Sequence, residues 1–375
     1  MLSPKSAELV EATLPAAGAA IGEISELFCT RVFDEHPILL RHLFNRGTQA
    51  NGTQAQALAG SVAVFASGLL GGKQPDAMLR RIAHKHVSVG VTSGQYAVVH
   101  KHLMGAIAEV LDVTPEIAAA WSEVYWLMAD TLIGLERFLP RGQEDYRVIA
   151  RFQETDDVVT FVVRPVNGPV PLNKPGQYVS VHVPLPGGIR QIRQYSPSGR
   201  TDDALQFSVK RDGEVSNHLH DHAPVGSTVR LSRPTGDVTL QPGDGPVLLA
   251  SAGIGCTPMI AMLDDLAATG SRREVIAVHG DRDQFSHPFR AELGQLVAKL
   301  EDGQAHVFYE EPVGQWPAER TGFVDLSSVP VPAGATAYLC GPVPFLRAVR
   351  AQLLEAGVTD IHYEVFGPDV VVSAG

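Results

Sequence analysis

The period of the hydrophobic pattern changes twice along this chain of 375 residues, and each period allows only one class of secondary structure. Up to about residue 139 the apolar residues recur every three or four positions, which predicts helices. Beyond residue 148 the period becomes two, in runs such as VVTFVVR and QYVSVHV, which predicts antiparallel strands, closed into a barrel. From Pro246 onward, strands such as PVLLASAG and EVIAVHG alternate with helical stretches, which predicts a parallel, doubly wound sheet.

Three domains are therefore expected. They are an all-α domain over residues 1–139, an antiparallel β-barrel over 140–243 and an α/β domain over 244–375. The hydrophobic fraction of 45% with 19% charged residues is ordinary for a globular protein and gives each domain enough apolar residues for its own core.

Charge and cysteine content exclude several functions. A net charge of -11 with scattered basic residues argues against a nucleic-acid partner. Three distant cysteines favour a reducing compartment over a disulfide framework. The N-terminus lacks the basic start of a signal peptide, and the longest apolar run is broken by glycine and proline, so no membrane span is expected. We expect a cytoplasmic monomer that acts on small molecules.

The stretch RIAHKHVSVG, residues 81–90, contains two histidines that are predicted to lie on different faces of a helix. At about 100° per residue, His86 lies about 40° from Ile82 on the apolar stripe, whereas His84 lies about 200° away. His86 should face the core and His84 the solvent. Two residues apart on a helix, they cannot chelate one metal together.

Other polar residues fall on apolar helical faces. Gln54 precedes Leu58 by one turn, Tyr96 shares a face with Leu103, and Glu136 follows Leu132. Such a set predicts either a buried polar network or a cofactor inside the helical domain. His84, His100 and His102 are expected to be exposed to solvent.

In the barrel, residues 190–196 read RQIRQYS. Arg193 can pair with a phosphate, Tyr195 can cover an isoalloxazine ring, and Ser196 can hydrogen-bond near the reactive nitrogen of a flavin. A helix that starts near Val215, Ser216 and Asn217 could direct its N–H groups at a pyrophosphate. Alone, each of these features is usually unremarkable in an ordinary strand or helix.

In the last domain, the turn SAGIGCTPM at 251–259 follows a predicted strand and opens a helix. Its glycines allow a ligand to approach the backbone, and Thr257 lies near the helix start. The segments YLCGPVPF at 338–345 and HYEVFGP at 362–368 end later strands.

The helical domain resembles a bacterial globin, through LFNRGTQANGTQAQAL and IAHKHVSVGVTSGQY. The resemblance implies that His86 ligates a haem iron, with Tyr96 and Glu136 hydrogen-bonded around it. It also implies that Phe44 packs on the haem and that Gln54 and Leu58 line the distal side. Cys29 stands where the family usually has a distal tyrosine, and a thiol is a weaker hydrogen-bond donor than a hydroxyl. Cys29 is either a ligand-facing thiol or merely a small buried hydrophobe.

The other two domains resemble the ferredoxin-NADP reductase family. This resemblance implies an FAD site formed by Tyr178, Arg193, Gln194, Tyr195, Ser196, Val215, Ser216 and Asn217. It implies an NADH or NADPH site formed by Gly253, Ile254, Gly255, Cys256, Thr257, Pro258, Cys340, Gly341 and Pro342, and by Glu364, Val365, Phe366, Gly367 and Pro368. Phe366 would stack on the flavin. Cys256 replaces the glutamine of close relatives, which leaves the choice of nicotinamide cofactor open.

The whole chain resembles the flavohaemoglobins, in which Lys85 and Glu364 match a pair between haem and flavin. The resemblance implies a nitric oxide dioxygenase that converts nitric oxide and O2 to nitrate with electrons from NAD(P)H, through FAD to haem b. One alternative is a haem-flavin oxidase or reductase, because Cys29 replaces the distal tyrosine. Another is a haem-based O2 or nitric oxide sensor, although gas binding alone needs no hydride supply.

Overall fold

The computed structural model describes residues 2–43 and 53–366, and these form two compact units. The first unit comprises the residues up to Gly142 together with Pro184–Arg193, and the second comprises Gln143–Val183 and Gln194–Phe366. Phe44, Gly367 and Pro368, as well as the side chain of Gln54, lie outside the described residues. No helix in the described ranges is both long enough and apolar enough to cross a membrane.

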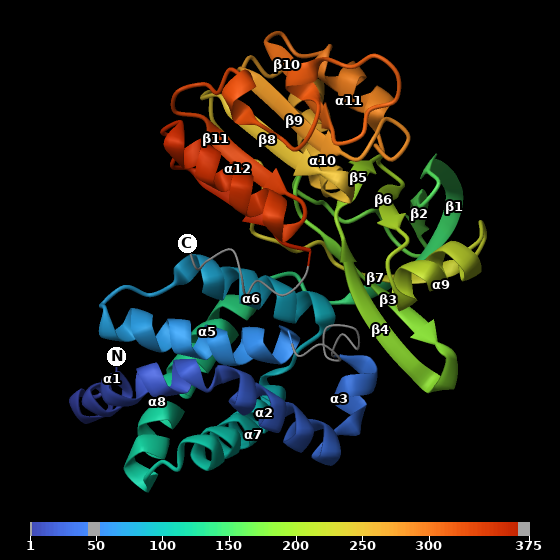
Figure 1. Ribbon diagram of the computed structural model, residues 1–375. Coiled ribbons are helices and arrows are strands. Elements are labelled where there is room, and N and C mark those ends of the chain that lie inside the picture. Colours follow the sequence, from blue (N-terminus) through green and yellow to red (C-terminus); the bar gives the residue numbers. More distant parts are fainter. Residues whose placement is uncertain (1, 44–52, 367–375) are drawn as a thin grey trace. The chain divides into compact units, whose positions relative to one another are not determined.

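The first unit is built of helices, as the period of its sequence predicts (Figure 1). They are α1 (Pro4–Ala19), α2 (Ile21–Glu35), α3 (Pro37–His42), α5 (Thr53–Leu70), α6 (Asp76–Val89), α7 (Ser93–Leu111) and α8 (Pro115–Glu136). Proline at the first helical position starts α1 and α8, and Gly90, in the left-handed conformation, ends α6. Their apolar faces meet in one core that includes Phe28, Phe65 and Trp121.

The position of the histidines on these helices differs in part from the prediction. In α6 the buried residues are Leu79, Ala83, Val87 and Ser88, and His86, with a side chain 29% exposed, lies at the margin of this stripe. The prediction that His102 is exposed is wrong, because its residue is only 4% exposed in the face of α7 that packs on α2. His84 and His100 are half-buried rather than fully exposed.

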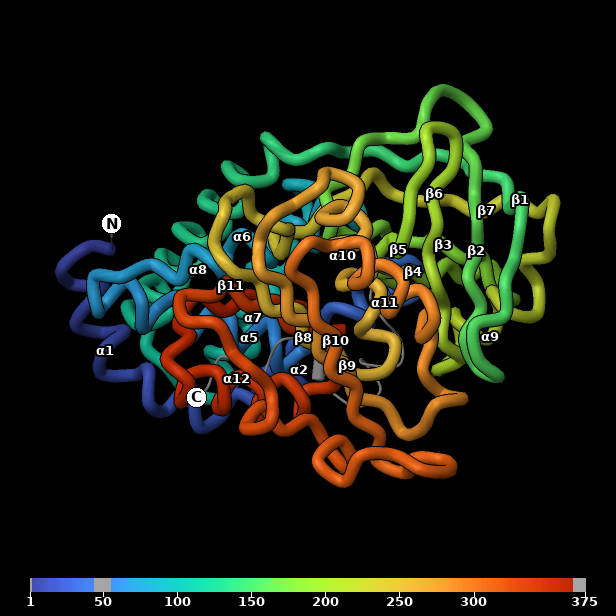
Figure 2. Tube along the Cα trace, turned by 90° about the horizontal axis from the view of Figure 1, so that it is seen from above, coloured from blue at the N-terminus to red at the C-terminus, as the bar shows by residue number. Residues whose placement is uncertain are grey.

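The chain continues into an antiparallel sheet whose strand order is β4-β3-β7-β1-β2-β6-β5. Most of this sheet belongs to the second unit, whereas β4 falls largely in the Pro184–Arg193 segment of the first. Figure 2 shows β6, β2 and β1 side by side. The strands are β1 (Gln143–Thr155), β2 (Val158–Pro165), β3 (Val179–Leu185), β4 (Ile189–Tyr195), β5 (Pro197–Arg200), β6 (Leu205–Lys210) and β7 (Thr228–Ser232), and α9 (Glu214–His222) lies between β6 and β7 in sequence. Stacked rings of Phe161 and Phe207, 5.6 Å apart, fill its core.

A parallel sheet with the order β10-β9-β8-β11-β12 completes the second unit. Its elements are β8 (Val247–Ala252), α10 (Cys256–Ala268), β9 (Val275–Asp281), α11 (Arg290–Val297), β10 (Gly303–Tyr309), β11 (Thr336–Cys340), α12 (Val343–Glu355) and β12 (Ile361–Glu364). The chain runs outward from β8 in one direction to β10, and returns on the other side to β11. The order therefore reverses between β8 and β11, which is where doubly wound sheets bind ligands.

Candidate functional site

His86 is held by two side chains from other helices. Its Nδ1 lies 2.8 Å from the hydroxyl of Tyr96, on α7, and 3.1 Å from Oε1 of Glu136, the last residue of α8. Tyr96 in turn donates a 2.6 Å hydrogen bond to the same Oε1. These three predicted site residues, 50 positions apart at their widest, are thus brought together, and the other ring nitrogen of His86, Nε2, is the one that could bind a metal.

The carboxylate of Glu136 is buried but well compensated. Burial by itself would raise the pKa of Glu136, yet the hydrogen bonds from His86 and Tyr96 and the charge of Arg141 outweigh it and lower the pKa. Burial and the hydrogen bond to Glu136 raise the pKa of Tyr96 well above its usual range. The network therefore holds a negative carboxylate and a neutral phenol beside the imidazole.

Arg141 extends this network beyond the helices. Its Nη2 donates to Oε2 of Glu136 at 3.0 Å, and its Nη1 donates to the carbonyl of Val91 at 3.1 Å. Val91 follows the glycine that ends α6, so Arg141 links the end of the His86 helix to the end of α8. The sequence analysis did not select Arg141, because it falls in the charged, turn-rich segment after the helical pattern.

Cys29 and Leu58 belong to the same helical core. Cys29, on α2, is 6% exposed, and Leu58, on α5, packs partly buried against that core. The helices α2 and α5 are in contact. Both readings of Cys29, a ligand-facing thiol and a small buried hydrophobe, are compatible with this position.

Several of the predicted flavin-binding residues cluster on the antiparallel sheet. Tyr178 forms an isolated bridge with Thr235, exchanging two backbone hydrogen bonds of 2.7 and 2.9 Å. Gln194 donates to the hydroxyl of Ser180 at 2.9 Å, and the ring of Tyr195 lies 5.7 Å from that of Phe207. Arg193 donates to the carbonyl of Ile192 at 2.8 Å. Ser196 is buried directly after β4.

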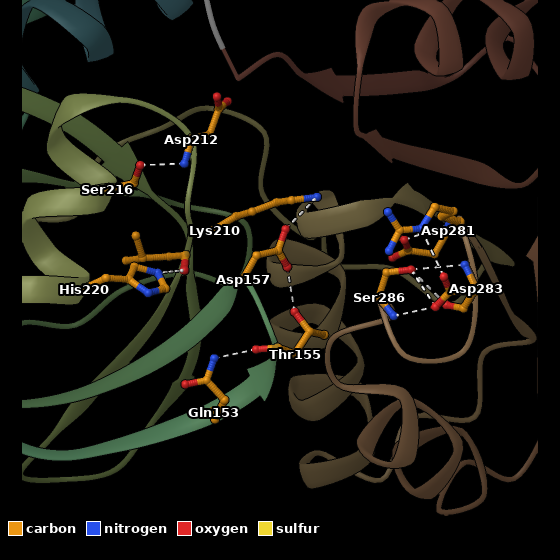
Figure 3. A network of polar contacts seen from close by, with 12 residues as sticks. Gln153, Thr155, Asp157, Lys210, Asp212, Ser216, His220, Asp281, Asp283 and Ser286 are labelled. Atoms are coloured by element: carbon orange, nitrogen blue, oxygen red, sulfur yellow. Dashed lines mark hydrogen bonds and ion pairs between the residues drawn. The ribbon is translucent and has the colours of Figure 1, made fainter.

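The helix α9 starts at Glu214, so Val215 and Ser216 lie in its first turn, where helix geometry leaves backbone N–H groups without intrahelical acceptors. The N–H of Asn217 already donates to the carbonyl of Gly213 at 3.1 Å. Figure 3 shows the amide of Asp212 directed at the hydroxyl of Ser216, a 2.7 Å hydrogen bond that fixes the turn before the helix. An anion at this terminus would meet Val215 and Ser216 rather than Asn217.

The predicted nicotinamide-binding segments meet at one edge of the parallel sheet. Gly253–Gly255 forms a short 3₁₀ turn after β8, and Cys340 ends β11, the neighbouring strand. A Cβ placed on Gly255 would lie 2.3 Å from the carbonyl oxygen of Cys340, so the two loops are in direct backbone contact. Glu364 is paired with Cys340 in register and leads into Val365, which is buried, and Phe366, which is exposed.

The two cysteines at this edge are not activated nucleophiles. Cys256 and Cys340 are fully buried, and burial raises the pKa of both thiols well above the usual range. The thiol of Cys256 has the carbonyl of Pro288 as a distant acceptor, at 3.9 Å. Buried neutral thiols behave as small apolar groups.

Comparison with known proteins agrees with both halves of the chain. Residues 27–132 match the Globin family, and residues 249–351 match the Oxidoreductase NAD-binding domain family. A flavohemoprotein of Rhizobium meliloti is 38% identical over 99% of this chain and 99% of its own length. The chain belongs to the flavohemoprotein family.

Solved structures of relatives support the same assignment. A flavohemoglobin from Malassezia yamatoensis, described with bound FAD and heme, superposes with a TM-score of 0.91 at 36% identity and covers 98% of this chain and all of its own. An FAD/NAD binding domain of a nitric oxide dioxygenase from Vibrio cholerae superposes with a TM-score of 0.56 at 35% identity, covering 60% of this chain and 99% of its own. The predicted fold class, a globin with a reductase of the ferredoxin-NADP reductase type, is confirmed.

In this flavohemoprotein, Lys85 is exposed on α6 and Glu364 is half-buried at the end of β12. They belong to different units, and their pairing stays a prediction.

A buried polar chain that the sequence pattern did not indicate lies at the same edge of the parallel sheet. Nδ1 of His279, on β9, lies 2.9 Å from the hydroxyl of Ser251, and the His279 ring stacks on the ring of His287 at 3.9 Å. Nδ1 of His287 lies 2.9 Å from the hydroxyl of Tyr309. Burial lowers the pKa of His287 to about 2, so this ring is neutral. The sequence signal that could have indicated this polar chain is a polar residue near the end of each predicted strand.

Beyond β9, the loop that follows is fixed by carboxylates. Asp283 accepts hydrogen bonds from the amides of Phe285 and Ser286 and from the Ser286 hydroxyl at 2.8 to 3.0 Å, and Figure 3 shows Asp283 and Ser286 close to Asp281. Burial opposes the charge, but these hydrogen bonds and the ion pair with Arg282 lower the pKa of Asp283 to about 2. The carboxylate of Asp283 therefore stays charged and holds the loop in place.

Proposed function

We propose that this chain is a nitric oxide dioxygenase, which converts nitric oxide and O2 to nitrate with electrons from NADH or NADPH through FAD to haem b. The joint approach of Tyr96 and Glu136 to Nδ1 of His86 carries the proposal. An imidazole whose Nδ1 is engaged by a carboxylate offers Nε2 to a metal, and the carboxylate makes it a stronger electron donor. This favours oxygen activation over storage.

The residues of the helical unit fit a haem of this kind. His86 is half-buried, with a side chain 29% exposed, so its ring is accessible for ligation while Glu136 and Tyr96 behind it are buried. The negative charge on Glu136 is retained because His86 and Tyr96 hydrogen-bond to one of its oxygens and Arg141 pairs with the other. Tyr96 and Glu136 are positioning residues, since both act on the metal through His86.

Residues of the antiparallel and parallel sheets fit the two remaining cofactors. Gly253 has no atom within 4 Å of where a Cβ would lie, so a nicotinamide nucleotide can approach the backbone of the turn after β8, and Gly255 lets this turn contact the Cys340 loop. The first turn of α9 offers N–H groups to a pyrophosphate, and Arg193 offers a guanidinium to a phosphate. When bound, the nicotinamide supplies a hydride, the flavin takes its two electrons and releases them singly, and the haem iron accepts one at a time.

One observation favours the alternative of a haem-flavin oxidase. Cys29 is buried in the helical core, where a thiol is a poor hydrogen-bond donor to a bound gas. Without a strong donor, electrons delivered to the haem could reduce O2 or peroxide instead of serving the reaction with nitric oxide.

The test measures NADH consumption by the full-length protein under O2, with and without nitric oxide, together with the nitrate formed. A dioxygenase consumes NADH faster when nitric oxide is added and yields nitrate in proportion to the nitric oxide lost. Unchanged consumption, or no nitrate, would refute the proposal and leave the oxidase. Replacing His86 with Ala should remove the haem Soret band and spare the flavin spectrum; a normal Soret band would contradict the assignment of His86 as ligand.

A further inference from the structure

Three potential metal ligands meet where α2 ends against α7. Glu35 is the last residue of α2, His36 caps that helix, and His102 lies on α7. One ligand atom from each residue lies within 4.8 Å of the other two. All three are in the first unit, and none of them belongs to the network around His86.

His102 is the buried member of this cluster. Its residue is 4% exposed, and within the described part of the chain its Nε2 is buried without a hydrogen-bond partner. Oε2 of Glu35 lies 3.1 Å from this nitrogen. A buried imidazole nitrogen this close to a carboxylate oxygen is well placed to share a metal ion with it.

His36 and the helix end complete the arrangement. The rings of His36 and His102 meet edge to face with their centres 5.6 Å apart. His36 is half-buried and lies at the C-terminus of a helix of 15 residues, where the helix dipole is negative and favours a cation. The site thus combines two imidazoles, one carboxylate and a helix end of suitable polarity.

Lys101 is the competitor for this carboxylate. Its Nζ lies 2.5 and 2.7 Å from the two oxygens of Glu35. Both side chains are largely exposed, at 62% and 48%, and such pairs contribute little to stability. A divalent cation, with twice the charge and direct bonds, can therefore displace the ammonium. Arg31, the next cation along α2, is paired with Glu109.

We propose that Glu35, His36 and His102 bind one divalent transition-metal cation, with zinc the best match. Two nitrogens and one oxygen are a common zinc ligand set, and water would take the fourth position. Tetrahedral zinc with bonds near 2.0–2.1 Å needs ligand atoms about 3.3 Å apart, so ligand atoms that now lie within 4.8 Å of one another must close in when the ion binds. The bound cation would tie the end of α2 to α7, and the assignment is independent of the proposed dioxygenase activity.

Equilibrium dialysis of the full-length holoprotein against zinc sulfate, with bound metal counted by mass spectrometry, tests this site. Wild-type protein should bind one zinc ion more than Glu35→Gln or His36→Gln, which alter side chains that are not fully buried and should fold normally. His102→Gln should also lose this ion. His100→Gln is the matched control, because His100 lies two residues away on α7, bonded to Ser122, and should leave zinc binding unchanged.

Lys101→Met tests the site by a change that should strengthen zinc binding instead of weakening it. Removal of the competing ammonium should tighten zinc binding several-fold without a new ligand, whereas weaker binding would contradict the site. Zinc should also raise the melting temperature of the wild type and of His100→Gln but not of Glu35→Gln. Equal zinc stoichiometry and affinity in the wild type, Glu35→Gln and His36→Gln would overturn the proposal.

Discussion

Tyr96 donates a 2.6 Å hydrogen bond to Oε1 of Glu136, the same oxygen that lies 3.1 Å from Nδ1 of His86. One carboxylate oxygen therefore orients both a phenol and an imidazole. Loss of the phenol would leave the buried carboxylate with one fewer donor and the imidazole with a less fixed ring plane.

Tyr96→Phe tests this relationship. We expect nitric oxide-dependent turnover to fall about 10- to 100-fold, as is typical when a group behind a metal ligand is lost. The rate of flavin reduction by NADH should not change, because Tyr96 lies in the helical unit. Stopped-flow measurement of both steps checks the prediction, and a turnover equal to wild type would show that the network does not tune His86.

Whether residue 29 contacts a bound gas can be tested by replacing Cys29 with tyrosine or with phenylalanine, which are nearly equal in size. Both Cys29→Tyr and Cys29→Phe enlarge a buried residue and should cost about 1–3 kcal/mol of stability. Only the tyrosine can donate a hydrogen bond to a bound gas. A bond worth about 1 kcal/mol would slow O2 release roughly fivefold relative to the phenylalanine variant. Flash photolysis gives the release rates, and equal rates in the two variants would place the hydroxyl away from the ligand.

Gly255→Ala should disrupt the nucleotide site. The new Cβ would meet the carbonyl of Cys340 at 2.3 Å, so one of the two backbones must shift. A displacement near 1 Å can cost about 100-fold in rate, and we expect a loss of that order in flavin reduction by NADH. Gly294→Ala is the control, since Gly294 lies in α11 with no atom within 4 Å of the added Cβ, and it should gain stability of up to about 1 kcal/mol.

His287 should make the second unit sensitive to acid. The folded ring, with its pKa lowered from 6.5 to about 2, stays neutral, whereas the unfolded ring binds a proton below about pH 6.5. The unfolded state binds more protons in that window, so stability falls as the pH drops below 6.5, by up to about 1.4 kcal/mol per pH unit.

Urea unfolding at pH 5 to 8, with flavin release as the signal, measures how the free energy of unfolding changes with pH. His287→Gln should flatten this slope, because the replacement does not titrate. His222→Gln should keep the wild-type slope, since His222 is exposed on α9. If His287→Gln and the wild type show the same slope, the acid sensitivity comes from other groups.

Much of this architecture follows from the sequence because helical and strand periods are local properties. The period predicted α6 and placed His86 near its buried stripe, at whose margin the structure finds it. It did not predict the burial of His102, because α7 carries apolar residues on several sides and no single stripe separates its buried face from its exposed face.

Contacts between strand ends could not be predicted from the sequence, for a different reason. The glycine turn after β8 and the Cys340 loop after β11 could each be found in the sequence, but their backbone contact depends on the register of parallel strands. Register is a tertiary property, set by packing across about 85 residues of intervening chain. The hydrogen bond between His279 and Ser251 depends in the same way on the register of β9 against β8, and was missed for the same reason.

The position of Arg141 has a consequence for where the helical half could be cut away from the rest. The apolar pattern ends at Leu139, and a fragment that stopped there would look complete by its sequence. It would lack the guanidinium that joins Glu136 to the backbone at Val91. A cut that keeps the hydrogen-bond network behind His86 intact therefore has to fall after Arg141, a short way past α8.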